Sequence, residues 1–373
     1  MSKIIISGYY GFENTGDEAI LLGIISNIRA VNKPVDICVL SRRPEITASR
    51  YGVRAINRNN FRAIIQEIKR CDLFLSGGGS LLQDITGWKS IPYYLGLVLI
   101  AQLMGKKTAF YAQGIGPVRG TLGRLLIKFV GNRTDLITVR DEASKELLVE
   151  LGVDQPKIKI TVDPVFGLAG KAGYIGKINK NSQLDNIINK DKPVIGVSVR
   201  PWGDSEYIKN LASGLNYLSD LSGGQFLIIP MHYYQDKEIS YQLKKLLDRP
   251  AVVLEKQYTP AGMLSLFSYL DLLVGVRLHS LIFAALNSIP FLGISYDPKV
   301  DNFINMVREN YVIDIEDPGV DLLKDTFNRL WSDREAFSKR LDNRLKEYRE
   351  VALQNAELAL NLIEGGYNHG NRK

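Results

Sequence analysis

The stretch "DLLVGVRLHSLIFAALNSIP", from Asp271 to Pro290, joins an apolar strand to an apolar helix. "LLVG" is a short run without polar residues that ends in glycine, which is typical of a buried strand. "LIFAAL" continues the apolar character into a segment that we interpret as a helix. A strand that is apolar on both faces and leads directly into a helix is typical of a parallel sheet covered by helices.

The same alternation of strand and helix occurs along most of the chain. In the first half, strands are predicted at "KIIISG", "VDICVLS", "DLFLSGG", "KKTAFYAQG", "DLITVRD" and "KIKITVD". In the second half, they are predicted at "KPVIGVSVR", "GQFLIIPM", "AVVLEK", "LDLLVGVR", "PFLGISYD" and "YVIDI". Helical segments such as Asp17–Arg29 separate most of these strands. The pattern predicts an α/β protein with parallel sheets.

One segment interrupts this alternation and divides the chain. Residues 167–192 are rich in Gly, Lys and Asn and have no convincing periodicity, so we expect a linker at 171–192. It separates an N-terminal Rossmann-like domain, 1–170, from a C-terminal Rossmann-like domain, 193–373, which ends in a long charged helix. Two such domains with parallel sheets facing a central cleft form a GT-B-like fold, and ligands are expected beyond the carboxyl ends of the strands.

The composition limits the class of protein. Lys plus Arg exceed Asp plus Glu by 47 − 40 = 7, which suits an anionic substrate or an anionic membrane surface. No compact basic run with interleaved aromatics is present, so nucleic acid is not expected as a partner. Cys38 and Cys71 are expected to be buried free thiols.

The longest apolar run, 91–105, is shorter than the roughly 20 residues of a membrane-spanning helix, so a buried helix is predicted. The start of the chain has no signal-peptide pattern, and the protein is therefore expected in the cytoplasm.

Polar residues follow the first predicted strand. The loop "GYYGFENTGDEAIL" lacks the GxGxxG spacing, and the acids Asp17 and Glu18 would repel a phosphate. Asn14, Thr15 and Asp17 are therefore expected to hydrogen-bond sugar hydroxyls. The alternative is a plain turn with capping acids.

Two further strands of the first half end in candidate site residues. In "SGGGSLLQD", Gly78 and Gly79 let the backbone approach a ligand closely, and Asp84 can act on a hydroxyl. Gln113, in "YAQGIGP", is a candidate for the cleft floor. The alternatives are a helix-capping role for Asp84 and a structural role for Gln113.

The second half places basic residues after its strands. Arg200 follows "GVSV", where a planar guanidinium can bind a carboxylate or phosphate at two points. His232 follows "IIPM" beside Tyr233 and Tyr234, a group that can contact a sugar face or form a packed aromatic cluster.

Arg277 and His279 lie at the junction of the opening stretch. A buried Arg requires an anion, and Asp271 is the only acid nearby in sequence, so a bound anionic ligand is the expected partner. The N–H groups at the start of the helix would bind the same anion. His279 is the leading acid/base candidate, since histidine exchanges protons near neutral pH. The alternative for Arg277 is an internal salt bridge.

These residues together resemble the polysaccharide pyruvyl transferase family, particularly its CsaB-like cell-wall branch. The resembling stretches are "GYYGFENTGDEAIL", "SGGGSLLQD", "YAQGIGP", "VRDEAS" and "GVRLHSLIFAA", which span both halves of the chain. The resemblance implies transfer of a pyruvyl group from phosphoenolpyruvate (PEP) to a sugar, with formation of a cyclic ketal. It places the PEP site on Arg200, Arg277 and His279, and an acidic residue on Asp84.

In the cell-wall branch, the acceptor is a lipid-linked precursor of a secondary cell-wall polymer that contains N-acetylmannosamine, and the pyruvylated polymer anchors S-layer proteins. The resemblance therefore implies a transferase in cell-wall biogenesis that is cytoplasmic and peripheral on the inner face of the membrane. Neither a metal nor a cofactor is expected, because Arg can balance the phosphate charge.

Two other functions remain open at this point. A glycosyltransferase that uses a nucleotide sugar would have the same fold, and its diphosphate would suit the same Arg and His. A non-catalytic carbohydrate-binding protein would bind the glycan without consuming PEP.

Overall fold

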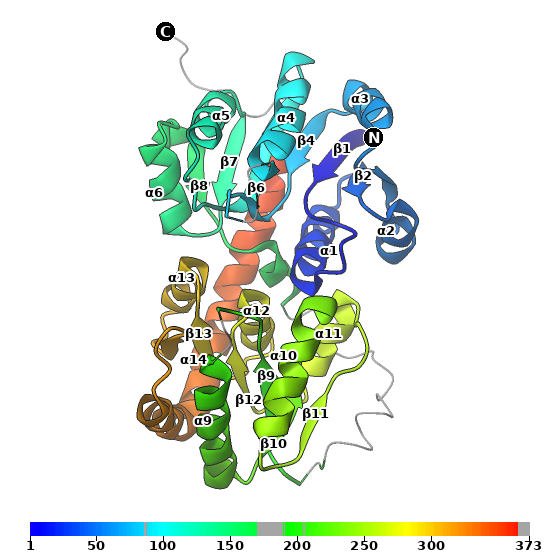
Figure 1. Cartoon of the computed structure of the whole chain (residues 1–373). Helices are drawn as coiled ribbons and strands as arrows, with labels where there is room; N and C mark the ends of the chain where they lie inside the picture. The colour runs from blue at the N-terminus through cyan, green and yellow to red at the C-terminus, as the bar shows by residue number, and fades with distance from the viewer. Residues whose placement is uncertain (86, 88, 170–188, 190, 204–205, 365–373) are drawn as a thin grey trace. The chain divides into compact units, whose positions relative to one another are not determined.

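The computed structural model describes residues 1–85, 87, 89–169, 189, 191–203 and 206–364. The chain forms two compact units (Figure 1). The N-terminal unit comprises Met1–Phe12, Asp17–Gly167 and Tyr348–Lys373; the C-terminal unit comprises Glu13–Gly16 and Leu168–Glu347.

The N-terminal unit contains one parallel sheet. Among the described residues it has eight strands, in the order β3-β2-β1-β4-β6-β7-β8, with β5 paired to β6. The strands are β1 Ser2–Ser7, β2 Val35–Ser41, β3 Arg54–Asn57, β4 Leu73–Ser76, β5 Gly79–Leu82, β6 Lys107–Ile115, β7 Leu136–Val139 and β8 Ile158–Ile160. Every residue of β4 and β7 is buried, as expected for strands covered on both faces.

Helices connect these strands. They are α1 Thr15–Ala30, α2 Pro44–Tyr51, α3 Phe61–Arg70, α4 Ser90–Leu103, α5 Thr121–Gly131 and α6 Glu142–Glu150, with 3₁₀ turns η1 Gln155–Lys157 and η2 Pro164–Leu168. Side chains cap several helix starts: Asn60 accepts from the Ala63 N–H at 3.1 Å, and Asp141 from the Ser144 N–H at 2.8 Å.

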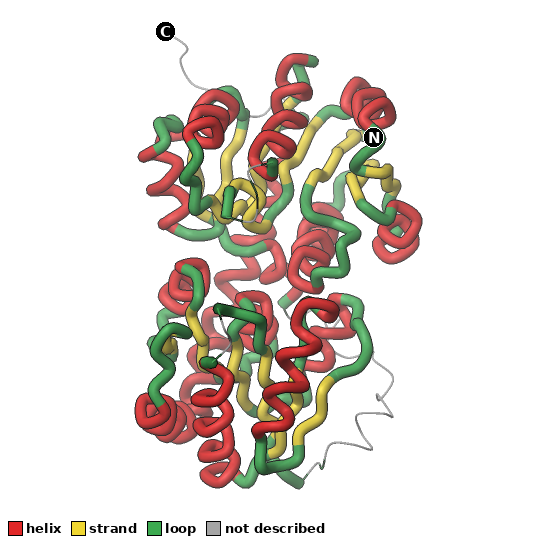
Figure 2. Tube along the Cα trace, in the orientation of Figure 1, coloured by secondary structure: helices red, strands yellow, loops and turns green. Residues whose placement is uncertain are grey.

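The C-terminal unit has a second parallel sheet. Its six strands within the described part of the chain lie in the order β11-β10-β9-β12-β13-β14. The strands are β9 Val194–Ser198, β10 Gln225–Ile228, β11 Ala251–Val253, β12 Leu272–Gly275, β13 Phe291–Ser295 and β14 Val312–Asp314. The helices are α9 Tyr207–Ser222, α10 Tyr233–Leu246, α11 Pro260–Phe267, α12 Leu278–Leu286, α13 Pro298–Met306 and α14 Val320–Asn361. Figure 2 shows the strands of each unit flanked by helices.

Both sheets have a point at which the strand order reverses. β1 lies between β2 and β4, and β9 lies between β10 and β12. At such a point, the connections that follow two neighbouring strands run to opposite faces of the sheet. A crevice opens between them at the carboxyl ends of the strands, and α/β proteins bind ligands there. The fold therefore singles out the residues that follow β1 and β4 in one unit, and β9 and β12 in the other.

The predicted fold class is confirmed, and each of the twelve predicted strands overlaps an observed one. The predictions missed β3, an edge strand whose residues are partly buried or exposed, and β5, which begins at the last of three consecutive glycines. The apolar run at 91–105 forms the buried helix α4 as predicted, and both cysteines are buried free thiols. None of the helices in the described residues is both long and apolar enough to cross a bilayer.

The expected domain boundaries need correction at the carboxyl end. The C-terminal domain was expected to include all of 193–373, but Tyr348–Lys373 belongs to the N-terminal unit. The contacts explain why: the Tyr348 ring packs on Phe166 with centroids 5.2 Å apart, and Lys33 Nζ lies 2.6 Å from Glu364 Oε2. Most of the expected linker, 171–192, lies outside the described residues.

Candidate functional site

Arg277 directly precedes α12 and forms an ion pair inside the protein. Its Nε donates to Asp236 Oδ2 at 3.1 Å, its Nη2 donates to Asp236 Oδ1, and Nη2 also lies 3.2 Å from Gln235 Oε1. Asp236, on α10, is completely buried. The alternative of an internal salt bridge is therefore present in the structure, with Asp236 as the partner of Arg277, and the expected contact with an anionic ligand stays a prediction. The partner lies 41 residues earlier in the chain, so sequence proximity could not reveal it.

This ion pair orients the guanidinium group. Two planar N–H···O contacts to one carboxylate fix both the position and the plane of an Arg side chain. Asp236 is itself fixed, because its Oδ2 also accepts the backbone N–H of His232 at 2.9 Å. The guanidinium nitrogen that neither Asp236 nor Gln235 engages is Nη1. The two-point contact expected toward a ligand is thus made to Asp236, which leaves a single well-oriented nitrogen for an anion.

Arg200 follows β9, next to the strand that precedes Arg277. Its guanidinium lies over the Tyr296 ring at 4.2 Å from the centroid, and its carbonyl accepts the Tyr207 hydroxyl at 2.5 Å. Burial raises the pKa of Tyr207; the Asp236 charge acts in the same direction, whereas the charges of Arg200 and Arg277 oppose it. Arg200 and Arg277 each follow one of the paired strands β9 and β12, which places the two predicted anion-binding residues at the same edge of the sheet.

The two predicted histidines of this unit belong to the same region. His279 lies on the first turn of α12 and is partly buried. His232 precedes α10. Burial, and then the positive charge of Arg277, lower the pKa of His232, while Asp236 opposes the shift. His232 is therefore held as a neutral imidazole beside the ion pair. Tyr233 and Tyr234 form an edge-to-face pair, but Tyr234 is 70% exposed, so neither a packed aromatic cluster nor contact with a sugar face is selected.

The turn Glu13–Gly16 belongs to the C-terminal unit. Thr15 N–H donates to the Met231 carbonyl at 3.4 Å, and a Cβ on Gly16 would lie only 2.4 Å from His279 Nδ1. Asn14 accepts the Gly16 N–H at 3.0 Å, so it caps the start of α1. Asn14 and Thr15 thus lie in the unit of His279, whereas Asp17 lies in the N-terminal unit.

Asp84 follows β5 and holds the entry to α5. Its Oδ2 accepts the N–H groups of Arg119 at 2.8 Å and Gly120 at 2.6 Å. One carboxylate oxygen is therefore committed to backbone structure, and within the described part of the chain Oδ1 accepts no hydrogen bond. The predicted position after a strand is correct, and the structural role is to fix a loop.

The glycines after β4 serve internal packing. A Cβ on Gly78 would lie 2.9 Å from Ile20 Cγ2, and one on Gly79, at φ +95°, would lie 3.2 Å from Asp17 Oδ1. The close approach that these glycines permit is therefore made by α1. Gln113 is completely buried, and its Nε2 donates to Ser76 Oγ at 2.6 Å. These contacts agree with the alternative of a structural role for Gln113, and its expected place on the floor of a ligand site stays a prediction.

Sequence reasoning missed three neighbours of the predicted arginines: Asp236, Tyr207 and Tyr296. One signal for Asp236 was present, because an acid in the first turn of the helix after "IIPMH" can bind the N–H groups at that helix start. The pairing of Tyr296 with Arg200 depends on the adjacency of β9, β12 and β13, which no local pattern encodes.

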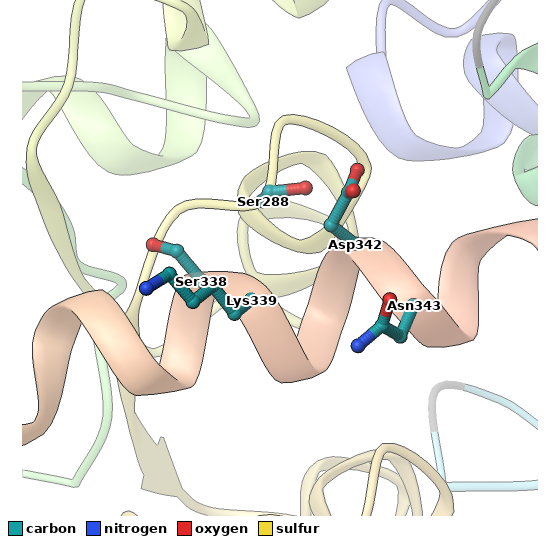
Figure 3. Close-up of a pocket in the computed structure, with 5 residues that line it drawn as sticks. All are labelled: Ser288, Ser338, Lys339, Asp342 and Asn343. Atoms are coloured by element: carbon teal, nitrogen blue, oxygen red, sulfur yellow. The ribbon is translucent and has the colours of Figure 1, made fainter.

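A shallow depression lies elsewhere in the C-terminal unit. It has a volume of about 470 Å³ and is lined by Ser288, Ser338, Lys339, Asp342 and Asn343 (Figure 3). Ser288 follows the carboxyl end of α12, whereas Arg277 lies at the amino end. The depression is therefore separate from the strand-end residues and from their chemistry.

Comparisons with known proteins agree with the fold and identify a family. The sequence model of the polysaccharide pyruvyl transferase family matches residues 14–298, which is more than half of the chain. No match was found among curated proteins.

Several solved structures share the fold over nearly the entire chain. S. aureus MnaA in complex with UDP has 12% identity, covers 100% of this chain and 99% of its own, and gives a TM-score of 0.69. Anabaena Alr3699/HepE with UDP and glucose has 11% identity, 98% and 100% coverage, and a TM-score of 0.67. The Neisseria meningitidis UDP-GlcNAc 2-epimerase bound to UDP-GlcNAc has 13% identity, 98% and 100% coverage, and a TM-score of 0.66. At these identities the likeness shows the fold alone, which is GT-B-like as predicted.

Proposed function

This chain belongs to the polysaccharide pyruvyl transferase family and is a pyruvyltransferase, and on that premise we propose that its donor is PEP and its acceptor an amino sugar. The acceptor we favour is N-acetylmannosamine in a lipid-linked precursor of a secondary cell-wall polymer. The product is a cyclic pyruvate ketal of a polymer that anchors S-layer proteins. The observation that carries the proposal is the basic region after β9 and β12, which joins Arg200, Arg277 and His279 within a family match.

The reaction requires a balanced transfer to two hydroxyl groups. One sugar hydroxyl forms a C–O bond to C2 of PEP while C3 takes up a proton. The C2–O bond to phosphate then breaks, inorganic phosphate leaves, and a second hydroxyl of the sugar bonds to C2. The sugar loses two hydroxyl protons in this reaction. One proton is gained by C3 of the pyruvyl group and one leaves with inorganic phosphate, so the protons balance. No oxidation or reduction occurs.

The basic region suits the donor. PEP carries a carboxylate and a phosphate, which match the Nη1 of Arg277 and the guanidinium of Arg200. The N-terminal N–H groups of α12 add donors for the same anion. His279, on that first turn, is the residue we assign to protonate C3. Asp84 is assigned to accept a hydroxyl proton through Oδ1, because its Oδ2 is engaged by backbone N–H groups.

The proposal is tested by phosphate release from PEP with a soluble N-acetylmannosamine disaccharide, with mass spectrometry of the product. We expect release that depends on both substrates and a product carrying one pyruvyl ketal. Unfolding temperature provides a second measurement: PEP should raise it, and a UDP-sugar should not. Stabilisation by a UDP-sugar without PEP turnover would instead support the glycosyltransferase alternative.

The location follows from the acceptor. We propose a cytoplasmic enzyme that associates peripherally with the inner face of the membrane, helped by the excess of 7 positive charges. Attraction to anionic lipid is screened by salt, so concentrated salt should release the protein from membranes. Retention after such washing would contradict this location.

A further inference from the structure

Four side chains in the N-terminal unit form a continuous stack. The rings of Tyr9 and Phe12 lie parallel, with centroids 4.0 Å apart and an interplanar angle of 6°. The guanidinium of Arg58 lies 5.0 Å from the Phe12 centroid and 4.4 Å from the Tyr93 centroid. The order is therefore Tyr9, Phe12, Arg58, Tyr93, and we call these four residues the aromatic stack.

Part of the aromatic stack comes from the loop after β1, which is one of the two strands at the switch point of its sheet. Tyr9 and Phe12 are in the loop after β1, and Arg58 directly follows β3. Tyr93 comes from the first turn of α4. The stack is thus built from the carboxyl side of the strands, where ligands bind in such sheets, although none of its members was predicted as a site residue.

The base of the stack is fixed by hydrogen bonds. Arg58 Nη1 lies 3.3 Å from the Gly8 carbonyl and 3.3 Å from the Tyr94 hydroxyl, and the Tyr93 hydroxyl donates to the Arg58 carbonyl at 2.9 Å. These contacts and the ring faces of Phe12, Tyr93 and Tyr94 occupy the cation. Arg58 therefore serves to hold Phe12 in place, and the stack is not arranged as an anion site.

The loop that carries the two outer rings is fixed as well. Gly11 N–H donates to Glu18 Oε1 at 2.7 Å, and Glu18 is almost completely buried. The Tyr10 carbonyl accepts the Arg42 N–H at 3.0 Å. A ring on such a loop is held in one orientation before a ligand arrives, which reduces the entropy lost on binding.

The outermost ring is partly exposed. Tyr9 is 37% exposed although one of its faces is covered by Phe12. Burial, and then the charge of Asp17, raise the pKa of the Tyr9 hydroxyl, while the charge of Arg58 opposes the shift. The exposed surface is therefore part of an aromatic ring that is held by a second ring.

We infer that the aromatic stack is the acceptor subsite, in which the exposed part of the Tyr9 ring binds a neutral sugar ring. The C–H groups on one face of a pyranose carry a partial positive charge and suit the negative face of an aromatic ring. The inference rests on the proposed function and assigns its acceptor a place.

The test compares Tyr9→Ala with Tyr9→Phe, which retains the ring. Binding of the N-acetylmannosamine disaccharide is measured by calorimetry without PEP, and KM values for both substrates by phosphate release. The control is Phe61→Ala on α3, an aromatic residue of the same unit that is 53% exposed and lies outside the stack. Unfolding temperatures are recorded for all variants.

We expect Tyr9→Ala to weaken disaccharide binding about tenfold or more, with the KM for PEP within twofold of wild type. Tyr9→Phe should restore most of the lost affinity, and Phe61→Ala should bind like wild type. The inference is overturned if Tyr9→Ala binds the disaccharide normally, if both KM values rise together with a loss of stability, or if the wild type does not bind the disaccharide. Disaccharide binding without PEP turnover would overturn the proposed function and leave this subsite intact.

Discussion

Replacement of Arg277 by lysine tests the central ion pair, because it keeps the charge and removes the planar fork. Lysine can place one nitrogen near Asp236, whereas Arg277 uses Nε and Nη2 there and keeps Nη1 in a fixed direction. A single ammonium group cannot bind Asp236 and an anionic substrate with the same geometry. We therefore expect both stability and turnover to fall.

The magnitudes follow from the hydrogen bonds that lysine cannot make. A hydrogen bond to a charged group contributes about 1.5–3 kcal/mol. Removal of one such bond at Asp236, which is completely buried, should cost about 2 kcal/mol and lower the unfolding temperature by about 4–8 °C. Removal of one oriented hydrogen bond to PEP should reduce kcat/KM about 10- to 150-fold.

The assay combines thermal unfolding with PEP-dependent phosphate release. Arg249→Lys is the matched control, because Arg249 pairs with Asp220 at the surface of the same unit, where both side chains are more than half exposed. Exposed pairs contribute little, so this variant should change stability by less than about 0.5 kcal/mol. A double-mutant cycle of Arg277→Lys with Asp236→Asn should give a coupling energy above about 1 kcal/mol. Turnover within threefold of wild type, or additive effects in the cycle, would refute the reasoning.

Four further predictions concern the same region. His279→Gln should retain PEP binding within a few-fold while the rate falls by ~10²–10⁴, measured by calorimetry and phosphate release; loss of PEP binding would make His279 a ligand clamp. Arg200→Ala should weaken PEP binding more than acceptor binding, and an unchanged PEP affinity in titration would assign Arg200 to structure. Because the pKa of His232 is lowered in the folded state, the unfolded chain binds more protons below about pH 6.5, so acidification through that range should reduce stability; denaturant midpoints of His232→Gln should decline less between pH 7 and pH 5. Treatment with EDTA should leave turnover unchanged, and a loss restored by a divalent cation would show that a metal takes part.

The fold could be predicted because its strands carry their own signal. β2 and β12 are buried over most or all of their length, and such runs remain visible in the sequence without any knowledge of their neighbours. β3 lacks this signal, since an edge strand buries little. The end of α14 belongs to the N-terminal unit through Phe166 and Lys33, which are distant in sequence, so periodicity alone placed it in the wrong domain.

The positions of several candidate site residues could be predicted from the sequence, but their interaction partners could not. Position after a strand depends on local order, so Arg200, His232 and Arg277 were all found by that criterion. Which side chains form an ion pair depends on the order of strands in the sheet. Asp236 was therefore not predicted as the partner of Arg277. The same limit explains Gln113: its place at the end of β6 was predicted, but its burial beneath the glycine loop depends on the pairing of β6 with β4 and β5.

The two switch points differ in chemical character, and the difference bears on the division of labour between the units. After β9 and β12, the C-terminal unit presents Arg200 and Arg277, and the pKa of His232 is lowered by burial and by the nearby cation. In the N-terminal unit, the loops after β1 and β3 carry Tyr9, Phe12 and Arg58 of the aromatic stack, and Arg58 contacts ring faces and oxygen acceptors. A basic surface attracts a small anion and an aromatic surface suits a neutral sugar ring. If the two proposals hold, donor and acceptor are recognised by different chemistry, and we expect an anionic analogue of PEP to compete with PEP and leave disaccharide binding unchanged. Competition of the analogue with the disaccharide in calorimetry would contradict this division.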